Sequence, residues 1–173
     1  MPKFAILILA TLLFVAPLSA SDSVETLNIE LSDPDIRITI PGMPKLEMGV
    51  HPMNASTPNL RLQGSNGIVS VSVMTPNISD EVSPIGCATA VANTVLTQSV
   101  VTREQVFLGR SDEQTFLIIY GLPLEQSVLL NTHIVSSEGD KRCIEAHVSK
   151  VSTSDSDIEP WFNGFGESSI DQL

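Results

Sequence analysis

The sequence predicts an α+β fold in which an antiparallel sheet of about six to eight strands is covered by a central helix and a C-terminal helix. Three observations support this prediction. Segments that alternate apolar and polar residues lie on both sides of one helical stretch, strands and helices do not alternate regularly, and an aromatic segment with helical spacing closes the chain. The core must be mainly aliphatic, because the chain has only one Trp, one Tyr and six Phe.

The N-terminal region is expected to form strands. Alternation with period 2 predicts strands at residues 27–31 and 36–40, with Asp33-Pro34 as the turn between them. Pro41-Gly42 is expected to end the second strand, and a further short strand is expected within residues 46–50.

A second hairpin is predicted where Asn66-Gly67 separates alternating segments at 60–62 and 69–73, because both residues of this pair tolerate a positive φ. The later part of the chain repeats the alternating pattern. Further strands are expected at residues 105–109, 115–120, 126–136 and 142–150.

The central helix is expected to begin near Ser83 and Pro84, which suit the N-cap and the first helical position. Small and β-branched residues then recur at helical spacing, which predicts close packing on a sheet. This stripe consists of Cys87, Ala88, Val91, Ala92 and Val95.

The last hairpin gives a specific placement for this helix. Cys143, Glu145 and His147 share one face of the final strand, and Ile144, Ala146 and Val148 share the other. If Cys143 bonds Cys87, the helix lies across the face that bears Glu145 and His147. The opposite face then needs its own cover, for which the C-terminal segment is the candidate.

The C-terminal segment is expected to be a helix. Asp155 and Asp157 are placed where helix caps belong, and an apolar stripe at i, i+3, i+4 and i+7 follows them. The stripe consists of Ile158, Trp161, Phe162 and Phe165.

This order of elements resembles the PsbP-like fold family, over most of residues 27–172: N-terminal strands, one helix, a run of meandering strands and a closing aromatic helix. The resemblance lies in element order and not in a residue motif. It implies a central antiparallel sheet between helices and a non-catalytic scaffold or binding role.

Residues 1–20 have the layout of a secretory signal, with one early charge at Lys3, an apolar run and a small residue at Ala20. The apolar run is shorter than the roughly 20 residues that span a bilayer. The sequence therefore predicts a signal peptide at 1–20 followed by a single domain at 21–173, located in the periplasm or secreted, with no membrane span after signal removal.

Export to an oxidising compartment predicts a disulfide between the two cysteines, Cys87 and Cys143. In the chain-entropy model a bond across this separation stabilises the fold by about 4 kcal/mol. The alternative is a catalytic thiol with His133 or His147 as its base, which requires the thiolate that a disulfide removes. The scattered Cys and His do not have the spacing of a metal site, and no metal or other cofactor is expected.

Two groups of residues are candidate sites. With the last turn centred on Asp140, His133 lies opposite His147 and Val135 opposite Glu145. The two His and Glu145 then form either a polar patch beside the helix or a site for metal binding or acid–base chemistry. The second group is an exposed turn that forms either a solvated hairpin end, which is favoured, or a loop that contacts a partner. It comprises Arg110, Ser111, Asp112 and Glu113.

The net charge of −11 argues against nucleic acid and anionic membrane surfaces as partners and favours a basic one. We find no nucleophile elbow, phosphate loop or dinucleotide fingerprint, so no catalytic residue is assigned. The expected function is that of a non-enzymatic, exported, acidic protein that binds another protein. The alternative is an inhibitor or immunity protein against a basic cell-wall hydrolase or toxin, and an enzyme that uses the His133 side is a third class.

Overall fold

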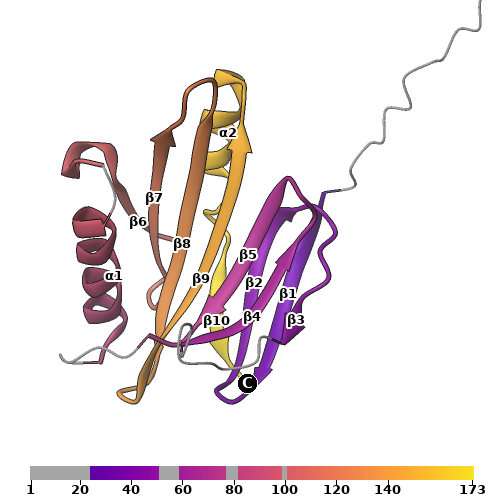
Figure 1. Ribbon diagram of the computed structural model, residues 1–173. Coiled ribbons are helices and arrows are strands. Elements are labelled where there is room, and N and C mark those ends of the chain that lie inside the picture. The colour runs from indigo at the N-terminus through magenta and orange to yellow at the C-terminus, as the bar shows by residue number, and fades with distance from the viewer. Residues whose placement is uncertain (1–23, 51–58, 77–81, 99–100) are drawn as a thin grey trace, which may run out of the picture.

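The computed structural model describes residues 24–50, 59–76, 82–98 and 101–173 (Figure 1). The signal expected at residues 1–20 lies outside them. The described residues form two antiparallel sheets, one long helix and one short C-terminal helix, which confirms the α+β class. The larger sheet has seven strands, in the order β3 (Gly49–Val50), β4 (Leu60–Ser65), β5 (Val69–Met74), β9 (Arg142–Ser152), β8 (Val128–Glu138), β7 (Phe116–Pro123) and β6 (Phe107–Arg110).

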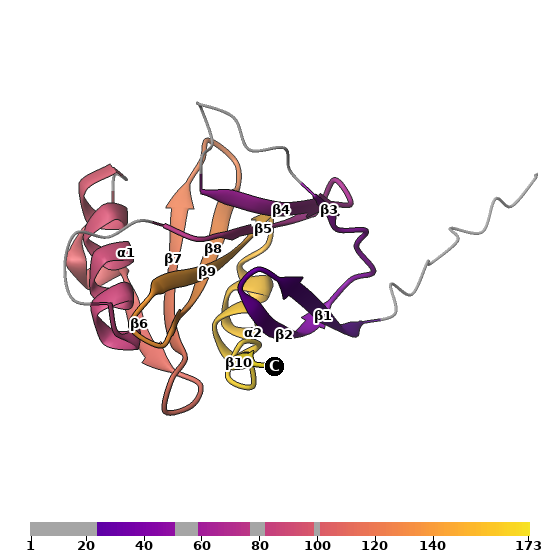
Figure 2. The same cartoon turned by 90° about the horizontal axis from the view of Figure 1, so that it is seen from below.

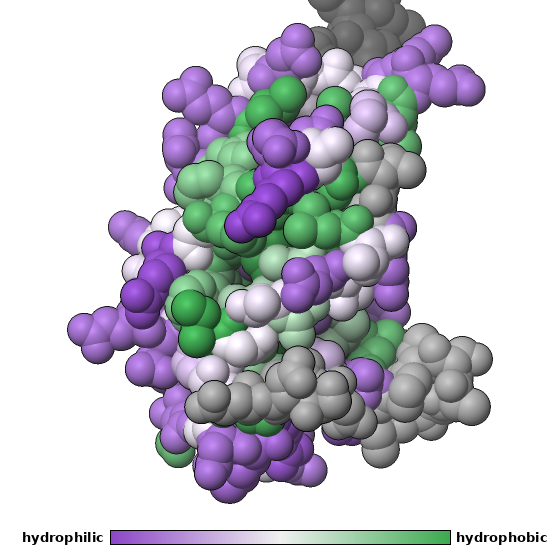
Figure 3. Space-filling model, turned by 90° about the vertical axis from the view of Figure 1, so that its left-hand side faces the viewer, coloured by the Kyte–Doolittle hydropathy of each residue, from purple (hydrophilic) through white to green (hydrophobic). Residues whose placement is uncertain are grey.

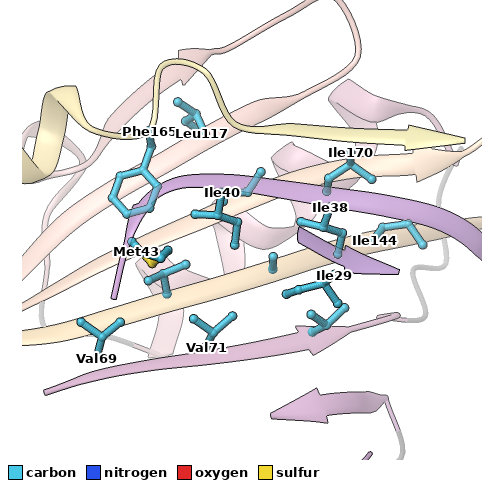
Figure 4. Close-up of a cluster of buried hydrophobic side chains, with 14 of the residues drawn as sticks. Ile29, Ile38, Ile40, Met43, Val69, Val71, Leu117, Ile144, Phe165 and Ile170 are labelled. Carbon is cyan, nitrogen blue, oxygen red and sulfur yellow. The ribbon is translucent and has the colours of Figure 1, made fainter. Parts of the chain in front are cut away.

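A second sheet, which the sequence analysis did not predict, packs on one face of the larger sheet. Its order is β1 (Glu25–Ser32), β2 (Asp35–Met43) and β10 (Ser169–Gln172), as Figure 2 shows from below. The aliphatic side chains of β2 point into the space between the sheets, as Figure 4 shows for Ile38 and Ile40 beside Ile144 of β9. The expectation that only the C-terminal segment covers this face is therefore wrong. The N-terminal hairpin has one apolar side, and it can bury that side only against the larger sheet.

The C-terminal segment shares this face but is less helical than predicted. A 3₁₀ turn at Asp155–Asp157 leads into α2 (Ile158–Asn163), which buries Trp161. Ser154 caps the turn by accepting from the Ser156 backbone N–H. The Asp157 carboxylate accepts instead from Ser152 and Lys150, so the prediction that the acids cap the helix is wrong at Asp157.

The long helix α1 (Pro84–Gln98) lies on the opposite face, where it packs mainly on β8 and β7. The side chain of Ser83 accepts a hydrogen bond from the Gly86 N–H at 3.1 Å, as expected of an N-cap. All five residues of the predicted stripe are buried, and Cys87 is bonded to Cys143 of β9 with a Cα–Cα distance of 5.5 Å. The predicted disulfide and the predicted position of the helix are both confirmed.

The turns follow the sequence closely in the hairpins. Asn66 and Gly67, with φ of +87° at the glycine, join β4 to β5 as predicted. Two strands run further than expected, because β2 continues through Pro41 and Gly42 and β7 continues through Pro123. Neither described helix is long and apolar enough to cross a membrane.

Candidate functional site

The residues of the predicted polar patch lie together in the structure, on the face of the larger sheet that α1 covers. His133 pairs directly with His147, and Val135 pairs with Glu145, in the register that the sequence predicts. His133 Nδ1 is 2.7 Å from Glu145 Oε1, and its Nε2 is 3.2 Å from the hydroxyl oxygen of Tyr120. The rings of Tyr120, His133 and His147 stack in one column, with centroids 5.7 and 4.3 Å apart.

This column is a buried network. His133 and Glu145 are 7% and 6% exposed, and His147 Nε2 is 3.0 Å from the amide oxygen of Asn131. Burial, followed by the charge of His133, lowers the pKa of His147 to about 3, so that its ring is neutral at physiological pH. Since both members of the His133–Glu145 pair are more than nine-tenths buried, the arrangement satisfies polar groups under the helix and presents no acid–base pair to solvent.

The predicted partner-contact turn is closed by its own hydrogen bonds. Asp112 Oδ1 accepts from the backbone N–H groups of Gln114 and Thr115, both at 2.7 Å. The Ser111 N–H donates to the Thr115 carbonyl at 3.1 Å. Three of the four predicted residues are exposed, and Ser111 is partly buried. Arg110 also closes the turn, because its Nη2 donates to the Glu113 carbonyl at 2.5 Å, while its guanidinium lies 4.9 Å from the centroid of the Phe116 ring.

Arg110 leads to a feature that the sequence analysis missed, an apolar groove between α1 and β6. The groove encloses about 660 Å³, within the usual range of ligand sites. Its floor includes Phe116 and Ile118 of β7, and its helix wall includes Ile85, Ala88 and Ala92. Figure 3, which faces this side of the molecule, shows apolar side chains gathered in and around a hollow with hydrophilic residues at its border.

Two of the groove's features suit binding. The large apolar side chains Ile85 and Leu108 are 63% and 58% exposed, and both line it. Its charged lining residues are Arg103 and Arg110, and its lining includes no acid, in a chain whose net charge is −11. We name this feature the α1–β6 groove, lined by Ile85, Ala88, Thr89, Ala92, Asn93, Leu96, Arg103, Val106, Leu108, Gly109, Arg110, Phe116, Leu117 and Ile118.

A sequence signal for the groove exists at α1. Ile85 and Leu96 follow helical spacing with Ala92 of the buried stripe, so that the helix is apolar over more than the face it buries on the sheet.

A second hollow lies at the end of the molecule where the 110–113 turn is found. It encloses about 650 Å³ and its lining includes Asp112, Glu113, Asp140 and Asp171 but no basic side chain. Within the described part of the chain, no group of three or more Cys, His, Asp or Glu is placed to hold a metal ion. No protein-family model and no curated protein matches the chain.

Proposed function

We propose that this chain is a non-enzymatic, exported binding protein that recognises another protein through the α1–β6 groove. The observation that carries the proposal is an open apolar groove that is lined by the exposed side chains Ile85 and Leu108 and by two arginines. Exposed apolar surface rimmed by polar groups marks interaction sites. The lining contains no Cys, His, Asp or Glu, which are the usual groups for nucleophilic, acid–base or metal chemistry.

Other features support export and binding. The Cys87–Cys143 disulfide fits an oxidising compartment, and the pattern of residues 1–20 fits a secretory signal, so the proposal places the mature chain in the periplasm or outside the cell. The PsbP-like order of elements belongs to the same proposal, since that family implies a scaffold or binding role.

The test compares two surface variants of the oxidised chain of residues 21–173 as baits for envelope and secreted proteins. Leu108→Asp places a charge in the groove, and Val50→Asp is the matched control, because Val50 is 83% exposed and lies on β3 at the opposite edge of the sheet. We expect a partner that the unmodified chain and Val50→Asp retain and that Leu108→Asp loses. If every retained protein binds both variants equally, the groove is not the contact and the proposal fails.

A second candidate function, inhibition of a basic cell-wall hydrolase or toxin, is favoured by the acidic hollow. Four carboxylates line this surface without a basic neighbour in its lining, and such a field steers basic partners. The double variant Asp112→Asn with Asp140→Asn should then weaken capture of a basic hydrolase, and the free protein should inhibit that hydrolase. Capture that is insensitive both to these changes and to salt would contradict the inhibitor function.

A further inference from the structure

The edge strand β6 borders the α1–β6 groove and limits which kind of protein surface can bind there. β6 is the terminal strand of the seven-stranded sheet and is exposed at Phe107, Leu108 and Arg110. An exposed edge presents backbone N–H and C=O groups that an extended segment can pair with.

The alternation of hydrogen-bonded pairs in the β6–β7 hairpin shows which residues of β6 have unpaired backbone N–H and C=O groups at the sheet edge. The Ser111 N–H donates to Thr115 O, and the register continues through Arg110–Phe116, Gly109–Leu117, Leu108–Ile118 and Phe107–Ile119. Hydrogen-bonded and non-hydrogen-bonded pairs alternate in an antiparallel ladder. Gly109 and Phe107 therefore bond to β7, whereas the N–H and C=O groups of Leu108 and Arg110 point away from the sheet.

The same two residues place their side chains in the groove. Leu108 shares a sheet face with Ile118, and Arg110 shares it with Phe116, and all four residues line the α1–β6 groove. On the opposite face, Phe107 contacts Phe162 of α2 with ring centroids 6.4 Å apart. An added Cβ at Gly109 would come within 2.7 Å of the Phe107 ring, so the glycine allows that ring to lie over the strand. The backbone edge and the apolar groove therefore run side by side.

The charges that line the groove further limit which segment can bind there. Arg110 and Arg103 both line the groove and both are exposed, while the chain as a whole is strongly acidic. A second copy of this chain would bring a net charge of −11 against another −11 and would place two Arg-bearing strands together. A separate segment with apolar residues and an acid matches both the lining and the charge.

We propose that the partner contributes an extended segment that adds to β6 as a further strand, with alternate apolar side chains over the α1–β6 groove and an acidic side chain beside Arg110 and Arg103. This inference rests on the proposed function and specifies how the groove is used. The backbone of Leu108 and Arg110 supplies the pairing, the groove selects apolar residues at alternate positions, and the arginines select the acid.

The probes are synthetic eight-residue peptides in which apolar residues alternate with Ser or Thr and one position carries Asp, Asn or Lys. Binding to the oxidised chain is measured by fluorescence anisotropy, and amide exchange is followed by NMR. We expect the Asp peptide to bind about tenfold more tightly than the Lys peptide, as charge-assisted hydrogen bonds to Arg require. The amides of Leu108 and Arg110 should become protected from exchange, because an added strand would hydrogen-bond to them.

Leu108→Pro and Leu108→Thr form a matched pair of variants. Proline removes the outward N–H without removing a bond to β7, since an edge strand tolerates Pro where the N–H faces away from the ladder. Threonine keeps the N–H, and thermal unfolding of both variants checks that they fold. We expect Leu108→Pro to bind the Asp peptide about fivefold to tenfold more weakly than Leu108→Thr does, as loss of a backbone hydrogen bond predicts.

The outcomes separate this inference from the proposed function. Suppose that Leu108→Asp loses a captured partner, that Leu108→Pro and Leu108→Thr bind it equally, and that neither amide is protected from exchange. Strand addition is then overturned, while binding through the groove still stands. If no peptide binds and no captured partner responds to Leu108→Asp, both fail. Self-association in sedimentation that Leu108→Asp abolishes would show that a second copy fills the groove, which also overturns the inference.

Discussion

The two faces of the seven-stranded sheet are covered in different ways. One face meets a second sheet and α2 across a cluster of buried aliphatic and aromatic side chains that includes Ile38, Ile144 and Phe165. The other face meets the single helix α1, whose contact stripe is built from Ala, Val and Cys. Figure 2 shows the two covers on opposite sides of the sheet.

The first cover therefore contributes most of the folding stability, and the second leaves surface that is available for binding. Aliphatic side chains from both layers fill the first face, and close packing of this kind dominates folding free energy. The single helix α1 packs on β8, β7 and β9 and does not cover the whole second face of the seven-stranded sheet. This face also holds the buried polar column of His133 and His147, and the α1–β6 groove lies where the helix leaves the sheet uncovered.

The largest effect should come from a cavity in the sheet–sheet layer. Ile38 is 0% exposed, and Ile38→Ala should lower the free energy of unfolding by about 4 kcal/mol, because the removed methyl groups leave a cavity. Urea denaturation of the oxidised chain measures the change. A loss below about 1 kcal/mol would mean that the two covers do not differ as described.

The next effect tests how α1 is held. Replacing both cysteines, Cys87→Ala with Cys143→Ala, should cost about 4 kcal/mol, because the bond joins residues 56 positions apart and restricts the unfolded chain. Denaturation with and without a reductant measures it. The double variant should be insensitive to the reductant, and equal stability of oxidised and reduced wild-type chain would contradict the prediction.

The polar column gives the second face a pH dependence. The pKa of His147 is lowered from 6.5 to about 3 in the fold, so on acidification the unfolded chain takes up a proton that the folded chain does not. The stability associated with this residue is complete above pH 6.5 and falls as the pH drops toward 3, by about 2 kcal/mol between pH 7 and pH 5.

The variant His147→Gln keeps a hydrogen-bond donor for Asn131 and removes the titrating ring. Its stability should change less between pH 7 and pH 5 than that of the wild type, as followed by urea denaturation at each pH. Identical pH profiles for the two proteins would show that His147 does not carry the dependence.

The smallest effect is expected at the groove itself. Leu108 is 58% exposed, so Leu108→Ser should change the free energy of unfolding by less than about 0.5 kcal/mol. Thermal unfolding of Leu108→Ser, Ile38→Ala and the unmodified chain under the same conditions compares the two losses of stability directly. A large loss at Leu108 would place this residue in the stabilising core and remove it from the binding surface.

The sequence predicts those parts of the fold that local pattern and turn chemistry determine. The register of β8 with β9 follows from the turn at Gly139, where φ is +53°, and from alternation on both strands. The buried stripe of α1 follows from helical spacing.

The parts that were missed depend on contacts between distant segments. The pairing of Ile170 in β10 with Ile38 in β2 joins the two ends of the described chain, and no local pattern specifies it. The α1–β6 groove depends on how far the helix lies from the edge strand. Of the predicted turn, only Arg110 lines that groove, because it alone of the four residues belongs to β6.

The bond between Cys87 and Cys143 links the groove wall to the redox conditions around the molecule. Cys87 lies in the first turn of α1, the helix that forms one wall of the groove, and Cys143 fixes that turn to β9. A disulfide forms only where thiols are oxidised, so this covalent link between the groove wall and the sheet requires an oxidising environment. In a reducing environment the first turn of α1 would be held to the sheet by packing of its buried stripe alone, so redox conditions control how rigidly this wall of the groove is held.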